Sequence, residues 1–158
     1  MTPRFNLYLG RAGQYHAMSE FLVRGWNIAV PEVDVGDDIL VLKDSDGILR
    51  RVQVKTAQAV IRAQSYSVQF SIPIKQLETS ISPELTYVLV IRKGHLWSNL
   101  LILRRETLLI EHEQFQVGTV LKDNLILYIA FQETKITCSK RDFSAFDRHF
   151  EDFPIIPH

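Results

Sequence analysis

The sequence predicts a single α/β domain with a mixed central β-sheet flanked by helices, and three observations support this. The chain has 158 residues, enough to bury one hydrophobic core and too few to require two. Hydrophobic residues make up 46% and charged residues 23% of it, so disordered, collagen-like and coiled-coil classes are excluded. A helical pattern comes first, and short apolar strands with further helical segments follow. We therefore expect residues 1–158 to form one domain.

Composition also limits what the chain can bind and where it works. Eighteen Lys and Arg residues balance eighteen Asp and Glu residues, so a local patch, not a whole-protein field, must meet any nucleic acid. The single cysteine, Cys138, excludes an internal disulfide and a cysteine-based zinc site. The N-terminal residues lack the apolar core of a signal peptide, and no apolar run approaches the roughly 20 residues of a membrane span. We expect a cytoplasmic protein with no membrane segment.

The first helix is predicted over residues 11–26. Its large apolar residues recur at three- and four-residue steps, as on one stripe of a helix, at Tyr15, Met18, Leu22 and Trp26. Gly25 stands where the C-cap of this helix would fall. The buried face of the helix is therefore expected to be this stripe.

Three strands are predicted next. Residues 28–30 form a short apolar stretch that Pro31 stops, and residues 39–42 form a second one after an acidic cluster. The Asp-Gly turn signal within residues 44–47 joins this strand to residues 49–55, in which apolar and polar side chains alternate. A hairpin therefore places the acidic cluster beside the end of the following strand.

The second half of the chain is predicted to contribute five more strands, at residues 66–72, 87–91, 96–103, 125–131 and 135–138. Pro73 ends the first of these, and residues 74–79 are predicted to form one helical turn. A further helix is predicted over residues 104–113. In the tail, three aromatic residues at helical spacing predict one more helix: Phe143, Phe146 and Phe150.

The informative polar residues lie around the first hairpin. Four acidic residues, the last of them Asp38, precede the second strand, and Gln53 and Lys55 lie on the next strand. Because side chains in a strand repeat every two residues, Gln53 and Lys55 point to one face while Val52 and Val54 pack behind them. The hairpin brings Asp38 next to this face, so a carboxylate, an amide and an ammonium group converge.

This set of groups suits Mg²⁺ and a substrate that carries phosphate. Mg²⁺ keeps several waters and uses few protein oxygens together with phosphate oxygens, and Asp38 and Gln53 each offer such an oxygen. Lys55 supplies the complementary task, because it can hold or deprotonate an attacking water, or stabilise negative charge that grows on phosphorus. The alternative is that the acidic residues form a solvated turn, where acids are common, and that Lys55 is an exposed strand lysine.

In order, spacing and predicted elements, residues 10–58 resemble the PD-(D/E)XK nuclease superfamily. The similarity is nearest to its Holliday-junction-resolvase-like branch, and the Gln-x-Lys form resembles certain homing endonucleases. The resemblance implies a restriction-endonuclease-like fold and Mg²⁺-dependent hydrolysis of DNA phosphodiester bonds, with Mn²⁺ as a substitute. It also implies a homodimer or a higher homo-oligomer. Asp38 matches the metal-binding aspartate of the family, Gln53 the second metal ligand and Lys55 the catalytic lysine.

Two positions depart from the family pattern. The second ligand is usually Glu, whereas Gln53 offers a neutral carbonyl that binds Mg²⁺ less strongly. On the first helix, the position that commonly carries Glu is Gln14. Glu20 lies six residues further on, about 240° around the helix, and is an imperfect replacement. With Asp38 as the only strongly placed anionic ligand, we expect weak metal affinity.

The sequence leaves three functions open. The first is a metal-dependent DNA endonuclease that uses Asp38, Gln53 and Lys55, with Gln14 or Glu20 contributing from the first helix. The second is a nuclease-like domain whose chemistry has decayed and which acts as a nucleic-acid-binding or assembly module; the two glutamines and the zero net charge favour it. The third is a structural subunit of a larger complex.

Overall fold

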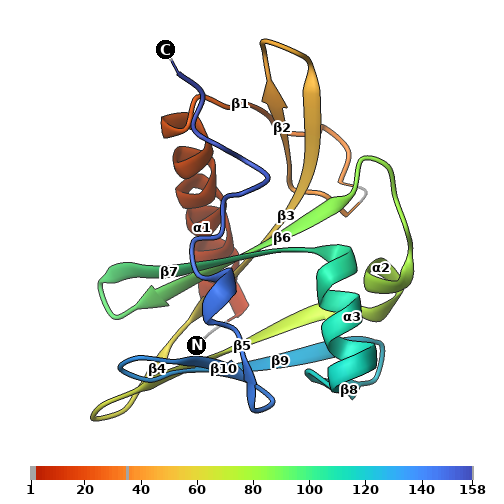
Figure 1. The fold of residues 1–158 in the computed structure, drawn as a ribbon. Coiled ribbons are helices and arrows are strands. Elements are labelled where there is room, and N and C mark those ends of the chain that lie inside the picture. Colours follow the sequence, from red (N-terminus) through yellow and green to blue (C-terminus); the bar gives the residue numbers. More distant parts are fainter. Residues whose placement is uncertain (1–2, 35, 158) are drawn as a thin grey trace.

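The computed structural model describes residues 3–34 and 36–157, and it shows a mixed α/β fold with two β-sheets flanked by helices (Figure 1). The helices are α1 (Pro3–Val23), α2 (Ile74–Glu78) and α3 (Arg105–Phe115), and a 3₁₀ turn spans Ser144–Phe146. The strands are β1 (Asn27–Ala29), β2 (Ile39–Lys43), β3 (Ile48–Gln58), β4 (Val60–Ile61), β5 (Tyr66–Pro73), β6 (Leu85–Lys93), β7 (Leu96–Arg104), β8 (Thr119–Leu121), β9 (Asn124–Phe131), β10 (Ile136–Cys138) and β11 (Arg141–Asp142). The expected α/β class is confirmed.

The first sheet has the strand order β1-β2-β3-β6-β7. All its neighbours are antiparallel except β3 and β6, which run parallel. The predicted hairpin is present, with Leu42 opposite Leu49 and Ile39 opposite Val52. Parallel strands need a long crossover connection, and here β4, β5 and α2 supply it. Gln53 therefore lies opposite Tyr87 in the centre of the sheet.

The second sheet was not predicted, because a single central sheet was expected. Its order is β11-β10-β9-β5-β4, with β8 paired to β9, and all these pairs are antiparallel. The strand β3 ends at Gln58 and β4 begins at Val60, so the chain passes from one sheet into the other almost as one continuous strand (Figure 1). This passage fixes the second sheet relative to the polar residues of β3.

Two hydrophobic cores hold these layers together. One lies between the sheets, where residues of β5 and β9 such as Phe70 and Leu127 meet residues of β6 such as Leu89. The other lies between α1 and the first sheet and includes Phe21 and Val52. The C-terminal segment covers this second core beside α1 (Figure 1). Within the described residues, no helix is long and apolar enough to span a membrane.

The predicted buried stripe of the first helix is wrong at Tyr15 and Leu22, whereas Met18 packs against the core and Trp26, beyond the end of the helix, is buried. The helix begins at Pro3 and ends at Val23, and its buried residues follow a strict four-residue step: Leu9, Gly13, Ala17 and Phe21. Tyr15 and Leu22 of the predicted stripe are exposed. Gly13 allows α1 to lie very close to Thr56 of β3, and the stripe that contains this contact also buries Leu9 and Phe21. Gly25, with a φ of 86°, is confirmed in its role at the end of the helix.

The predicted tail helix was also wrong. Only the 3₁₀ turn at Ser144–Phe146 forms there. Phe143 is buried in the core between the sheets, whereas Phe150 is buried in the core beneath α1. A continuous helix would have turned these two side chains toward similar directions, so the extended path of the tail allows each to fill a different core.

Candidate active site

Asp38 is anchored at the entrance to β2. Its N–H donates to the carbonyl of Val52 at 2.9 Å, which continues the β2–β3 ladder by one residue. Its carboxylate oxygen Oδ2 accepts two hydrogen bonds from β3: from the Val54 N–H at 2.7 Å and from Gln53 Nε2 at 2.6 Å. The predicted meeting of Asp38 and Gln53 is therefore present.

The surroundings of Asp38 make ionisation of its carboxyl less favourable. Burial raises its pKa above the ordinary value for aspartic acid, and Asp34 adds to this. The hydrogen bond from Val54 and the positive charge of Lys55 lower the pKa in part. Lys55 is half-buried on β3, and within residues 3–34 and 36–157 its ammonium makes no hydrogen bond or ion pair. Its charge therefore acts on Asp38 and stays free to meet a ligand.

Gln53 is almost fully buried, with 8% of its surface exposed. Its Nε2 group faces Asp38, so its carbonyl oxygen points away from that carboxylate and accepts a hydrogen bond from Gln76 Nε2 at 3.3 Å. Gln76 belongs to α2 and also donates to the Gly36 carbonyl at 2.7 Å. Tyr87 of β6 donates to Gln76 Oε1 at 3.1 Å.

Sequence reasoning missed Gln76 and Tyr87. The parallel pairing of β3 with β6 brings Tyr87 opposite Gln53, and the crossover connection delivers Gln76 to the same place. No local spacing signals either contact, because both depend on how distant parts of the chain pair.

The first helix contributes Gln14 and not Glu20 to this site. Gln14 Nε2 donates to the backbone carbonyl of Asp38 at 3.2 Å, and its Oε1 accepts from Arg11 at 2.9 Å. Glu20 lines a separate cavity of about 220 Å³, together with residues of β7 and of the C-terminal segment such as Trp97 and Arg148. Asp38, Gln53, Lys55 and Gln14 do not line that cavity.

The nearest other acidic residues are already engaged. Asp37, with 4% of its surface exposed, forms an ion pair with Arg51 at 3.4 Å. Asp34 accepts a hydrogen bond from the Gly36 N–H at 2.9 Å. Consistently, the described part of the chain contains no group of three or more His, Cys, Asp or Glu residues arranged to hold a metal ion.

The oxygens around Gln53 Nε2 nevertheless have the chemistry that a hard divalent cation requires. Nε2 lies 2.6 Å from Asp38 Oδ2 and 3.5 Å from the carbonyl of Val54. Asp38 Oδ2 and the Val54 carbonyl oxygen thus converge on the position of Gln53 Nε2, which carries a partial positive charge. A cation at this position would be bound by one carboxylate and one carbonyl oxygen. The residues therefore fit Mg²⁺ with few protein ligands. A role for the Val54 carbonyl as a metal ligand was not predicted from the sequence.

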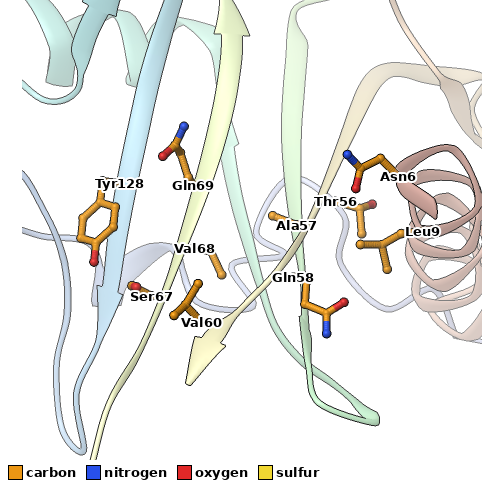
Figure 2. Close-up of a pocket in the computed structure, with 10 residues that line it drawn as sticks. All are labelled: Asn6, Leu9, Thr56, Ala57, Gln58, Val60, Ser67, Val68, Gln69 and Tyr128. Atoms are coloured by element: carbon orange, nitrogen blue, oxygen red, sulfur yellow. The ribbon is translucent and has the colours of Figure 1, made fainter. Parts of the chain in front are cut away.

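A cavity of about 420 Å³ adjoins the strand that carries Lys55. Figure 2 shows the residues Thr56, Ala57 and Gln58 of β3 between Asn6 and Leu9 of α1 on one side and the second sheet on the other. The second sheet contributes residues of three strands: Val60, Ser67, Val68, Gln69 and Tyr128. None of the lining residues is charged. The cavity offers hydrogen-bonding and apolar groups but no cation for a phosphate.

A bacterial homing endonuclease of known structure has a similar fold. The two superpose with a TM-score of 0.54 and 18% sequence identity, over 90% of this chain and 86% of that chain. At this identity the likeness shows the fold alone. No protein-family model matches the chain, and no curated protein matches it in sequence.

Proposed function

We propose that the chain is a Mg²⁺-dependent endonuclease of the PD-(D/E)XK type that hydrolyses DNA phosphodiester bonds, with Mn²⁺ as a substitute for Mg²⁺. The observation that carries the proposal is the convergence of Asp38 and Gln53 at 2.6 Å, with Lys55 two residues along the same face of β3. The similarity in fold to a homing endonuclease supports it.

Each residue has a distinct part in this proposal. Asp38 and the Val54 carbonyl would hold the cation, and Gln53 would add its own carbonyl once its amide had turned. When bound, Mg²⁺ would polarise the phosphate and lower the pKa of a water. Lys55 would orient the attacking water and stabilise negative charge near phosphorus. Gln14 would hold the Asp38 backbone in place, and Glu20 has no part, because it lines another cavity.

The proposed partner is DNA, bound by a homodimer or higher homo-oligomer. A single site of this kind cuts one strand, so a break in both strands of a duplex requires two sites. The uncharged cavity beside β3 would meet bases or sugars and not phosphates, because no cation lines it. Phosphate contacts would then come from Lys55 and from Arg11 of α1, which is exposed.

The test is cleavage of duplex, branched and single-stranded DNA with Mg²⁺ or Mn²⁺. We expect cleavage by the wild type and its loss in both Asp38→Asn and Lys55→Ala. The first variant removes the anionic ligand of the metal, and the second removes the ammonium group that orients the attacking water. Asp152→Asn, at the surface beside Arg104, is the matched control and should cleave like the wild type. A wild type that cuts none of these substrates, or an Asp38→Asn variant that cuts normally, contradicts the proposal.

One observation favours a second function, a nuclease-like module that binds nucleic acid or assembles complexes without cutting. Gln53 turns its NH₂ group toward Asp38, and this donor occupies the position of a cation. Calorimetry with Mn²⁺ separates the two functions. Saturable binding that is lost in Asp38→Asn supports the enzyme, whereas DNA binding with no Mn²⁺ binding supports the module.

A further inference from the structure

Four side chains form a hydrogen-bonded chain that ends on Asp38. Tyr87 donates to Gln76, Gln76 donates to Gln53, and Gln53 donates to the Asp38 carboxylate, at 3.1, 3.3 and 2.6 Å respectively. The chain connects β6, α2, β3 and the start of β2. Every bond in it runs in the same direction, so each donor strengthens the next.

The direction of both amides is set by groups that can only accept hydrogen bonds. The Gly36 carbonyl lies 2.7 Å from Gln76 and requires Nε2 on that side. The Asp38 carboxylate and the Val54 carbonyl likewise require the Nε2 group of Gln53 on their side. With Gln76 fixed in this way, its N–H group meets the carbonyl oxygen of Gln53.

This arrangement opposes the turn that Gln53 needs to become a metal ligand. If the Gln53 amide turned over, its Nε2 would face Gln76 Nε2, and two donors would meet where a donor and an acceptor now lie 3.3 Å apart. Turning Gln76 as well would place its oxygen against the Gly36 carbonyl, at a position now 2.7 Å away. Either turn costs at least one part-buried hydrogen bond.

We infer that Gln76 is a positioning residue that holds the Gln53 amide with its NH₂ group toward Asp38 and thereby lowers the affinity of the site for divalent cations. The inference rests on the proposed function in that the cation is the one proposed there. Gln76 itself need not touch the cation. The Tyr87 hydroxyl helps to hold Gln76 in this orientation, because it donates a hydrogen bond to Gln76 Oε1.

The test is Mn²⁺ calorimetry on the full chain without DNA. We expect Gln76→Leu to bind Mn²⁺ about two- to tenfold more tightly than the wild type, because the turn of Gln53 no longer breaks the hydrogen bond with Gln76. Tyr87→Phe keeps the buried ring and should raise the Mn²⁺ affinity by a smaller factor. This variant tests the inference if Gln76→Leu does not fold. Gln114→Leu, on the exposed face of α3, is the matched control and should leave the affinity unchanged.

A second measurement follows the Gln53 side-chain amide by NMR during a Mg²⁺ titration. Its resonances should move at lower Mg²⁺ concentration in Gln76→Leu than in the wild type. A purely structural role for Gln76 predicts weaker binding, since a damaged site does not gain affinity.

The outcomes separate this inference from the proposed function. Equal or weaker Mn²⁺ binding in Gln76→Leu and Tyr87→Phe, with binding in the wild type that depends on Asp38, overturns the inference and leaves the endonuclease proposal standing. Tighter binding in these variants without DNA cleavage by any of the proteins supports the inference and removes the endonuclease. No Mn²⁺ binding by wild type or variants overturns the inference together with the metal site.

Discussion

The close packing of α1 on β3 can be tested at Gly13. A Cβ atom added there would lie 1.9 Å from Thr56 Oγ1, 2.5 Å from its Cγ2 and 2.7 Å from its Cβ. Rotation of Thr56 does not relieve the last contact, so the helix itself must move. Alanine in a helix gains about 1 kcal/mol over glycine, whereas overpacking of this kind costs about 3 kcal/mol at the upper end of its range. We expect Gly13→Ala to lower the free energy of unfolding by about 2 kcal/mol.

The measurement is urea unfolding followed by circular dichroism. Gly10→Ala is the matched control, because a Cβ at Gly10 meets nothing within 4 Å, and it should raise the free energy of unfolding by up to about 1 kcal/mol. Adding Thr56→Ala to Gly13→Ala should recover part of the loss. Equal stability of Gly13→Ala and Gly10→Ala would refute the reasoning, since it would mean that α1 does not approach β3 so closely.

Two further predictions concern charged groups. Because burial raises the pKa of Asp38 in the folded protein, the cost of folding with an ionised carboxyl is absent below the ordinary pKa of aspartic acid and grows as pH rises from there through the raised pKa. In urea unfolding at a series of pH values, Asp38→Asn should therefore gain stability relative to the wild type as pH rises through this window, and a difference that stays constant with pH contradicts this. Glu84→Ala leaves Arg105, 5% exposed, without its carboxylate at 2.6 Å and should cost about 3 kcal/mol. Asp152→Ala breaks an exposed pair with Arg104 at 3.6 Å and should cost less than about 1 kcal/mol, so similar losses in thermal or urea unfolding would refute this distinction.

The part of the site that lies within one hairpin was predicted from the sequence. The Asp-Gly turn and the alternation after it fix which residues of β2 and β3 lie opposite one another, so Asp38 and Gln53 were expected to meet, and they do. The burial of Val52 and Val54 follows from the same two-residue period. Such contacts are local, and their geometry is determined by a few residues.

The remaining part depends on contacts between distant segments. The buried face of α1 includes Gly13, whose small size is useful because Thr56 of β3 lies close behind it, whereas hydrophobic periodicity favours larger residues. Tyr87 and Gln76 join the site through a parallel pairing and a crossover that leave no short-range pattern. The second sheet was not predicted because the local sequence pattern indicates where strands lie but not which strands pair.

The near-continuous passage from β3 into β4 has a consequence for the length of any ligand. Val60 lies five steps along the chain from Lys55, and a strand rises about 3.3 Å per residue, so the two lie at most about 17 Å apart along this path. That span equals roughly five base pairs of a duplex, at about 3.4 Å each. The backbone thus sets a fixed distance between the Lys55 ammonium group and the second sheet. Inserting one residue between them would lengthen this segment by about 3.3 Å and would turn every later side chain of the strand to the opposite face.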